Sequence, residues 1–559
     1  MANACRWCAS PIVLTASDQV ILAKVTPEIG GVKQPLPEPT LCGTCQHQLR
    51  MAFRNQQTLY DGNCDQCGKD VISLFSPDRS GQVYCSDCWW SDSWDAMQYA
   101  RDFDFSRSFT EQFRELVLAV PKVALLNWRG ENSAYCNYTY GNKNCYLVFG
   151  GDFNQDCYYG TLCMHNENSL DLNFSDGNRL CYGLQDSHYC YSSSFLVDCR
   201  NVSDSAFCSD CTACSECILC TNLINRSYCI ENVQYSREEY YRRKAVLLNG
   251  SHAAWKLMEQ RFAALRSERI VKYAHVTSSE DCTGDYVQHS KACFNSYDIQ
   301  DGRDLNDLVF GMKSTDCLQS SMLGEGSELC YNVLSAIKSS RIVASLVSIE
   351  CSDLLYCYNL SNCRNCFGCF GLSHKEFCIF NRQYSPEEYT KLVAKIIAHM
   401  RSTGEWGEFM HPSLALFGYD ESYAQTNYPL GQKDALQRGF NWSGSLSPNP
   451  RGGKVIQASR LPDSIFSIPD AITNYTIECE VTGKPFRIIP QELRFYREHN
   501  LPLPRRHPDV RNLDRLAFRN PRKLYNRPCM SCARPVMTTY APNRPEKMYC
   551  EECYVKAVY

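Results

Sequence analysis

The sequence predicts a mainly β protein in which a duplicated, Cys-rich β-solenoid with capping helices is flanked by small Cys-rich domains. Three observations predict this fold class: paired CxxC motifs at both ends, cysteines in a phase of three through the middle, and a long stretch that occurs twice. The 559 residues allow several domains. A hydrophobic share of 44 % with 21 % charged residues excludes a mostly disordered chain.

The N-terminal segment, 1–90, contains two sets of four cysteines, each made of two CxxC pairs. The loop between the pairs is short in one set, at 68–84, and longer in the other, at 9–41. Each CxxC presents two thiolates to one ion, and the intervening chain returns the second pair to complete a tetrahedron. We therefore predict two zinc ribbons within 1–90, followed by a connector over 91–130. Their predicted ligands are Cys5, Cys8, Cys42 and Cys45, and Cys64, Cys67, Cys85 and Cys88.

The cysteines between positions 136 and 229 are all spaced by multiples of three. Neither a strand, with a period of two, nor a helix, with 3.6, gives this phase. A coarser interval also occurs, which predicts a β-solenoid with about 18 residues per coil and inward cysteines. The thirteen cysteines are Cys136, Cys145, Cys157, Cys163, Cys181, Cys190, Cys199, Cys208, Cys211, Cys214, Cys217, Cys220 and Cys229.

The Cys-rich stretch occurs twice at a constant offset, which predicts solenoid units over 131–275 and 278–403. Cys220 and the residues after it match Cys369 and its successors. Each copy ends in a Ser-x-x-Glu pattern, at Ser236 and at Ser385, which predicts a helix N-terminus and a capping helix. Cys293 and Cys317 break the phase of the second copy, which indicates small insertions.

The central cysteines leave a second interpretation open. Cys208-x-x-Cys211-x-x-Cys214-x-x-Cys217-x-x-Cys220 and Cys363-x-x-Cys366-x-x-Cys369 resemble the spacing of iron–sulfur ligands. However, the spacing continues the phase of the whole repeat, whereas ligands that converge on one ion would break it. We therefore favour structural stacking over an iron–sulfur or thiol redox centre.

A connector over 404–470 precedes a basic segment, 471–528, that contains an Arg-rich stretch with interleaved aromatic residues. Such a surface is suited to following phosphates and stacking on bases, so we predict contact with RNA, the ribosome or a protein partner. The alternative is ion pairing within the chain, to acids of the N-terminal region at Asp87, Asp92, Asp95, Asp102 and Asp104. The candidate residues are Arg494, Arg497, Arg505, Arg506, Arg511, Arg515, Arg519, Arg522 and Lys523.

The C-terminal segment, 529–559, repeats the zinc-ribbon pattern, and its loop at 533–549 matches the short N-terminal one in length. All twelve terminal ligands then complete closed shells, and a closed shell has no open position for a substrate or water. The sequence also lacks GxGxxG, GxxxxGK[ST], HExxH and GxSxG motifs. We therefore predict about three zinc ions and no enzymatic activity. The C-terminal ligands are Cys529, Cys532, Cys550 and Cys553.

With these motifs the chain resembles a family of zinc-ribbon, Cys-rich repeat proteins of uncharacterised function from uncultured small-genome bacteria. The runs Gln-Tyr-Ser-Pro-Glu-Glu-Tyr at 383–389 and Leu-Pro-Leu-Pro-Arg-Arg-His-Pro-Asp at 501–509 carry the resemblance. The segment 479–515 resembles a degenerate zinc ribbon in which Thr482, His507 and Val510 replace three of the four cysteines. The resemblance implies a ribbon-shaped fold without zinc there.

We therefore predict a cytoplasmic, non-enzymatic zinc-binding scaffold that interacts with a partner through its basic C-terminal region. No apolar run is long enough to cross a membrane, and no small-molecule substrate is indicated. Two alternatives stay open: an iron–sulfur or thiol redox enzyme that uses the central cysteines, and a self-assembling structural solenoid.

Overall fold

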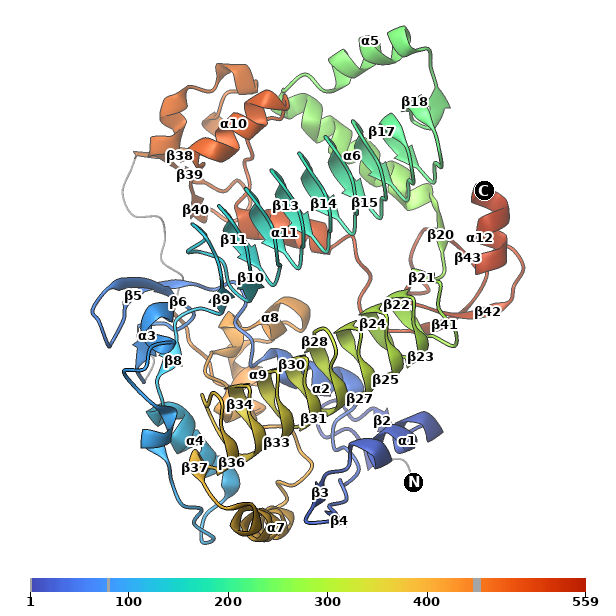
Figure 1. Cartoon of the computed structure of the whole chain (residues 1–559). Helices are drawn as coiled ribbons and strands as arrows, with labels where there is room; N and C mark the ends of the chain where they lie inside the picture. The colour runs from blue at the N-terminus through green and yellow to red at the C-terminus, as the bar shows by residue number, and fades with distance from the viewer. Residues whose placement is uncertain (1–2, 78–80, 446–453) are drawn as a thin grey trace. The chain divides into compact units, whose positions relative to one another are not determined.

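The computed structural model describes residues 3–77, 81–445 and 454–559, and the chain forms two compact units. Unit 1 comprises Met1–Ala124, Ala274–Leu446 and Met537–Thr539, and unit 2 comprises Leu125–Tyr273, Ser447–Val536 and Tyr540–Tyr559. Each unit contains one of the two Cys-rich repeats, seen in Figure 1 as a row of stacked strands. Each unit therefore combines distant parts of the sequence, and the boundaries between the units fall within several of the predicted segments, such as 91–130 and 404–470.

Unit 2 contains a nine-stranded sheet, here called the first ladder, whose strands are parallel until the last one reverses. Equivalent positions on neighbouring strands are 12 residues apart in the sequence, as Asn144 and Asp156 are. The longer interval predicted from the cysteines is therefore wrong. The strands are β11 (Tyr146–Phe149), β12 (Tyr158–Thr161), β13 (Leu170–Asn173), β14 (Tyr182–Gln185), β15 (Ser194–Val197), β16 (Ala206–Ser209), β17 (Ser215–Thr221), β18 (Ser227–Ile230) and β19 (Val233–Gln234).

The phase of three comes from the backbone of the first ladder. From position 186 to 204 every third residue has a positive φ between 48° and 57°, for example Asp186, Tyr189 and Ser192. A left-handed residue turns the chain sharply, so successive bends recur at every third residue. Cysteines directly follow such left-handed residues, as Cys199 follows Asp198. Their side chains therefore have the same orientation relative to each bend.

The interior of the first ladder is lined by the thirteen cysteines together with a few valines and leucines. All of these cysteines are at most 3 % exposed. Most of their thiols donate to backbone carbonyls within the ladder, as Cys220 Sγ does to the oxygens of Ile218 and Cys229 at 3.3 and 3.6 Å. The small thiol side chain thus fills a narrow interior in which larger apolar groups would crowd.

The second ladder, in unit 1, consists of two sheets that take alternate strands of the chain up to β35, and all of their strands are parallel except the last one, β37. One sheet contains β21 (Val276–Thr277), β22 (Gly284–Gln288), β24 (Ser296–Gln300), β26 (Val309–Met312), β28 (Ser321–Leu323), β30 (Leu334–Ile337), β32 (Leu346–Ile349) and β34 (Tyr358–Ser361). The other contains β23 (Lys291–Phe294), β25 (Arg303–Asn306), β27 (Thr315–Leu318), β29 (Glu328–Tyr331), β31 (Ser340–Val343), β33 (Ser352–Leu355), β35 (Arg364–Phe367), β36 (Glu376–Ile379) and β37 (Arg382–Gln383).

An insertion lies in the second ladder where the cysteine phase predicts one. The Ser296 hydroxyl accepts from the amide 12 residues later, whereas the Ser320 hydroxyl accepts from the amide 13 residues later. The extra residue falls at the turn around Gly326, whose φ is +77°. Cys317 precedes this turn and Cys330 follows it, so the two cysteines differ in phase although both are buried.

Helices follow each ladder at the predicted N-caps. In unit 2 the Ser236 hydroxyl accepts from the Glu239 amide at the start of α5 (Arg237–Leu247), and α6 (His252–Glu268) follows. In unit 1 Ser385 and Glu388 form a complete capping box at the start of α7 (Pro386–Ser402). The prediction that these helices close the ends needs correction for α6, whose Trp255 ring lies 4.7 Å from that of Phe207. This helix therefore covers the face of the first ladder.

The N-terminal elements of unit 1 pack on the second ladder. They include α1 (Ala16–Val25), α2 (Gly43–Met51) and α4 (Phe109–Ala119), which share one hydrophobic core with it. Arg50 of α2 is fully buried and donates to Ser321 Oγ at 3.1 Å and Asn332 Oδ1 at 3.0 Å. The first predicted ribbon is thus anchored on a repeat that comes much later in the sequence.

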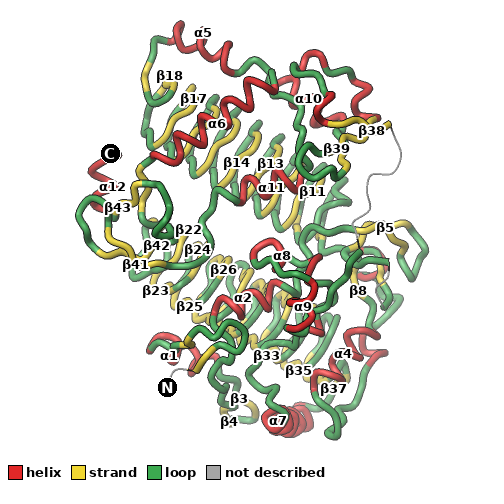
Figure 2. Tube along the Cα trace, turned by 180° about the vertical axis from the view of Figure 1, so that it is seen from behind, coloured by secondary structure: helices red, strands yellow, loops and turns green. Residues whose placement is uncertain are grey.

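In unit 2 two further helices, α10 (Pro490–Glu498) and α11 (Pro508–Leu516), lie beside the first ladder. Figure 2, from behind, shows α6 and α11 running across its strands. The short sheet β38 (Lys454–Gln457), β39 (Tyr475–Glu478), β40 (Pro485–Phe486) precedes them. None of the helices in the described part of the chain has both the length and the apolar character that a membrane span requires.

Candidate metal centres

Three groups of four cysteines bring their thiols together, and they are the three sets predicted from CxxC spacing. In each group all four Sγ atoms lie within 4.8 Å of one another. One Sγ–Sγ distance from each group is 3.7 Å for Cys8–Cys42, 3.9 Å for Cys67–Cys85 and 3.7 Å for Cys532–Cys550. A tetrahedron with metal–sulfur bonds of about 2.3 Å has edges of about 3.8 Å. The thiols are therefore spaced for one tetrahedral ion, whereas a disulfide needs about 2.05 Å.

The same backbone frame holds the first CxxC pair in all three groups. The amide of the first cysteine, Cys5, Cys64 or Cys529, donates to the carbonyl five residues later at 2.8 Å. The residue four positions after the first cysteine is Ala9, Gly68 or Ala533 in the three groups. It has a positive φ, and its amide donates to the carbonyl of that first cysteine. This tight turn directs both thiols to one side, as a metal knuckle requires.

A helix begins directly after the third cysteine of each group. Cys42, Cys85 and Cys550 are the N-cap residues of α2, α3 (Ser86–Trp89) and α12 (Glu551–Val558). The fourth cysteine follows within the first turn. The strand before the third cysteine pairs with the knuckle, as the Met530 amide does with the Met548 carbonyl at 3.0 Å. Figure 1 shows this arrangement at the C-terminus, where β43 (Lys547–Tyr549) leads into α12.

Backbone donors favour the thiolate form of the first cysteine in two of the groups. Burial alone would raise the pKa of Cys64, but amide donors from Cys85, Cys67 and Gln66 lower it to about 6. The Cys85 amide lies 3.2 Å from Cys64 Sγ. Burial would also raise the pKa of Cys529, but backbone amide donors lower it to about 6. The strongest of these donors is the Cys550 amide, which lies 3.2 Å from Cys529 Sγ. Since a metal binds the thiolate, these donors prepare the ligand.

The segment that resembles a degenerate ribbon has the same backbone frame without the ligands. The Cys479 amide donates to the Lys484 carbonyl at 3.1 Å, and the Gly483 amide returns to the Cys479 carbonyl at 2.9 Å. The His507 amide lies 3.2 Å from Cys479 Sγ and His507 is the N-cap of α11, so it occupies the place of a third cysteine. Its Nδ1 accepts from the Asp509 amide at 3.0 Å. Among the described residues Cys479 belongs to no group of three metal-ligating side chains.

The central cysteines form no such group. In the described part of the chain, none of the ladder cysteines lies in a set of three ligand atoms within 4.8 Å. Burial raises the pKa of Cys208 and Cys357 well above the usual value for a thiol, whereas hydrogen bonds from the Cys208 and Cys217 thiols lower the pKa of Cys220 to about 5. All 36 cysteines have free thiols. The spacing of the thiols therefore favours hydrogen-bonded packing over a cluster in the ladders.

The basic segment is largely occupied by partners inside unit 2. Arg511 and Arg515 are buried and both bind Asp171, at 2.5 and 3.1 Å. Contact of these two with a nucleic acid or protein partner stays a prediction. Most other members of the candidate set also have a partner within the unit: Arg497 binds Asp470, Arg506 binds Glu480 and Asp514, Arg519 binds Asp186, Arg505 binds the Leu461 carbonyl, and Lys523 lies over the Tyr525 ring. The side chain of Arg494 is exposed, and that of Arg522 is partly buried.

The predicted internal partners of these arginines also need correction. The acids of the N-terminal region pair elsewhere: Asp87 with Lys69 at 3.6 Å, and Asp95 with Lys375 at 3.4 Å. Three of the arginines instead bind acids of the first ladder that are distant in the sequence: Arg511 and Arg515 bind Asp171, and Arg519 binds Asp186. No sequence pattern marked Asp171 as the partner, because it is one acid among many in the repeat.

Comparisons with known proteins add little. No family model and no curated protein matches this sequence. Among solved structures, a putative acetyltransferase from Desulfovibrio desulfuricans G20 is similar over 57 % of this chain and 88 % of its own, with 9 % identity and a TM-score of 0.12. A score this low carries no argument about fold or function.

Proposed function

We propose that this chain is a non-enzymatic, zinc-binding scaffold protein with three four-thiolate sites, each of which holds one zinc ion. The observation that carries the proposal is the agreement of the three groups in thiol spacing, backbone frame and helix start. Four thiolates are the ligand set of structural zinc sites. When bound, zinc would tie each knuckle to the start of its helix, at Cys42, Cys85 and Cys550.

A structural role is supported over a catalytic one by the ligand number. Catalytic zinc sites use three protein ligands and leave a fourth position for water or substrate. Here the fourth thiol is already within contact range of the other three. The segment at 479–515 supports the same view: its frame persists with a single cysteine, as expected of the degenerate ribbon that the family resemblance implies.

We further propose that each ladder closes into a β-solenoid with 12 residues per coil, the separation of equivalent positions in both ladders. In the first ladder the strand β12 is hydrogen-bonded on both sides: the Tyr158 amide donates to the Ser169 carbonyl, later in the chain, and the Leu162 amide donates to the Phe149 carbonyl, earlier in the chain. Bends at every third residue then give four short sides per coil. Each ladder ends in one antiparallel strand, β19 or β37, followed by a capped helix, which supports a discrete protein over a self-assembling one.

The arrangement of the basic segment supports a structural role for its arginines better than contact with RNA or the ribosome. Through Asp171, the pair Arg511 and Arg515 ties α11 to the first ladder. Arg494 and Lys523 are the exposed members of the candidate set through which a nucleic acid or protein partner would act.

Zinc content of paired variants tests this function. Cys529→Ser removes a ligand from a complete group, so we expect the protein to hold about one zinc ion fewer than wild type. Cys479→Ser is the matched control, because it changes a cysteine in the same backbone frame that has no ligand group. Unchanged zinc in Cys529→Ser, or an equal loss in the control, would contradict the assignment.

A further inference from the structure

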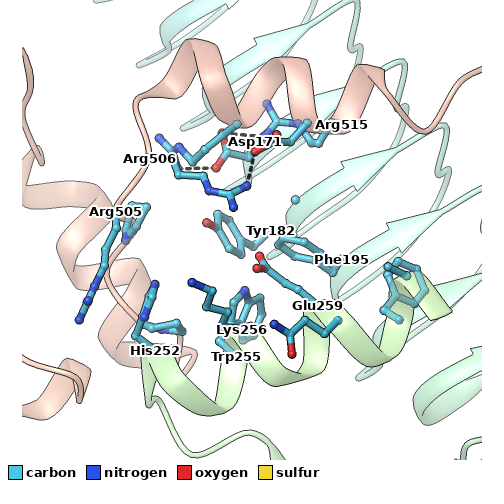
Figure 3. A pocket seen from close by; sticks show the side chains of 18 of the residues that line it. Asp171, Tyr182, Phe195, His252, Trp255, Lys256, Glu259, Arg505, Arg506 and Arg515 are labelled. Carbon is cyan, nitrogen blue, oxygen red and sulfur yellow. Dashed lines mark hydrogen bonds and ion pairs between the residues drawn. The ribbon is translucent and has the colours of Figure 1, made fainter. Parts of the chain in front are cut away.

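A cavity of about 470 Å³ lies in unit 2 against the face of the first ladder. Its floor is formed by β13, β14 and β15, one wall by α6, and the opposite wall by α11 and the loop 502–506 that precedes it. Figure 3 shows the two helices on either side of the strands, with side chains from all three parts directed toward the space between them. Its volume is in the range of small-molecule sites, roughly 300–1,000 Å³.

One wall of the cavity contains two buried guanidinium groups that share a single carboxylate. The side chains of Arg511 and Arg515 are 8 % and 6 % exposed, and both bind Asp171. In each arginine Nε and Nη2 have no hydrogen-bond partner. Glu492 lies near Arg511, but burial raises the pKa of its carboxyl to about 8, so it is mostly neutral at pH 7. The wall therefore has an excess of positive charge and unused donors.

An unpaired buried charge is unfavourable unless an opposite charge joins it. Guanidinium groups match the oxygens of a phosphate or carboxylate, with which they form charge-assisted hydrogen bonds. An anion in the cavity next to Arg515 would supply this missing charge. The structure thus indicates the sign of the ligand and the kind of group that would face α11.

The opposite wall is aromatic. Trp255 of α6 meets Phe195 of β15 edge to face at 5.3 Å, and Tyr182 of β14 at 6.2 Å. Phe262 and Phe518 also line the cavity. Such a wall suits a flat apolar group, which gains both buried area and aromatic contact.

The rim carries charges of both signs. Arg506 binds Glu480 at 3.4 Å and Asp514 at 2.7 Å, so this arginine is already neutralised. Burial raises the pKa of the third rim acid, Glu259, which weakens its repulsion of an anion. Lys256, Arg505 and His252 complete the rim (Figure 3). The buried wall therefore determines the preference for an anion.

We propose that this cavity binds a small aromatic organic anion, whose phosphate or carboxylate lies at Arg511 and Arg515 and whose ring lies against Trp255 and Phe195. The proposal concerns a site that contains none of the twelve thiol ligands, and it goes beyond the scaffold role. Sequence reasoning missed it because its floor and walls come from three separate segments, at 170–197, 252–268 and 502–518.

Isothermal titration calorimetry on the full chain tests the proposal with 2-naphthyl phosphate, 2-naphthoate, neutral 2-naphthol and inorganic phosphate. We expect at least one of the two aromatic anions to bind at least tenfold more tightly than 2-naphthol and than phosphate alone. The better of the two anions identifies the preferred acid group. Equal binding of 2-naphthol, or no binding of either aromatic anion, would overturn the proposal.

A pair of neighbouring alanines on α6 provides a matched control. Ala263 lines the cavity and Ala264 does not, and both are exposed, so each tolerates a larger side chain without disturbing the core. We expect Ala263→Trp to weaken binding of the aromatic anion at least tenfold and Ala264→Trp to change it less than twofold. Arg515→Gln should also weaken binding at least tenfold where it folds. Unchanged binding in Ala263→Trp would place the ligand elsewhere and overturn the proposal.

Discussion

Four asparagines stack inside the first ladder, one every 12 residues. Asn142, Asn154, Asn166 and Asn178 are at most 1 % exposed, and each of the last three donates from its side-chain amide to the side-chain oxygen of the one before at 2.9–3.2 Å. Each also donates to a backbone carbonyl nine residues later, as Asn166 does to Ser175 at 3.0 Å. At the residue scale, the ladder is thus fixed by polar groups that are fully paired, beside the weakly paired thiols.

Removing one member of this stack should be costly. Asn166→Ala leaves the buried Asn178 backbone amide without a partner and removes one hydrogen bond each from the Asn178 side-chain amide and the Ser175 carbonyl. We therefore expect a loss of about 3 kcal/mol in the free energy of unfolding. Urea unfolding followed by circular dichroism measures it. Gln155→Ala, on the exposed side of the same ladder, is the control and should change stability by less than about 0.5 kcal/mol. A similar effect of both substitutions would contradict the account of the stack.

A second residue gives a pH signature. Glu492 is fully buried, neither carboxyl oxygen has a hydrogen-bond partner, and burial raises its pKa to about 8 although Arg511 opposes the shift. A raised pKa in the folded state stabilises the protein below the unfolded value of about 4.5, and this contribution is lost as the pH rises through about 8.

Glu492→Gln removes this titration, so the variant should gain stability relative to wild type as the pH rises. Between pH 5 and pH 9 we expect the difference in unfolding free energy to change by about 4 kcal/mol in favour of the variant. Urea titrations of both proteins at pH 5, 7 and 9 measure it. Parallel pH profiles would show that Glu492 is ionised, or solvated, in the folded protein.

At the scale of elements, the sequence predicts what depends on short spacing. The three thiol groups, the N-caps at Ser236 and Ser385, and the insertion before Cys330 all follow from residues close together in the chain. The 12-residue separation of neighbouring strands could not be predicted from the cysteines alone. Leucine, valine and asparagine take some of the same inward positions, so the cysteines by themselves show a longer interval. The asparagine stack repeats every 12 residues and would have given the correct one.

At the scale of the whole molecule, the chain enters each unit more than once, so each ladder is packed by segments from distant parts of the sequence. This explains why the anion-binding cavity and the partner of Arg511 could not be predicted: both depend on which strand of a repetitive ladder a helix meets. The cysteines of the first two thiol groups belong to unit 1, and those of the third group belong to unit 2. In the proposed scaffold, both units therefore contain zinc.

The most direct test is elemental analysis of the full chain, purified without added metal, with acid-labile sulfide assayed on the same sample. The scaffold account predicts about three zinc ions per chain, no iron and no sulfide, because among the described cysteines only the terminal thiols are spaced for a metal. Iron with a matching amount of sulfide would contradict it and make the ladder cysteines the active centre.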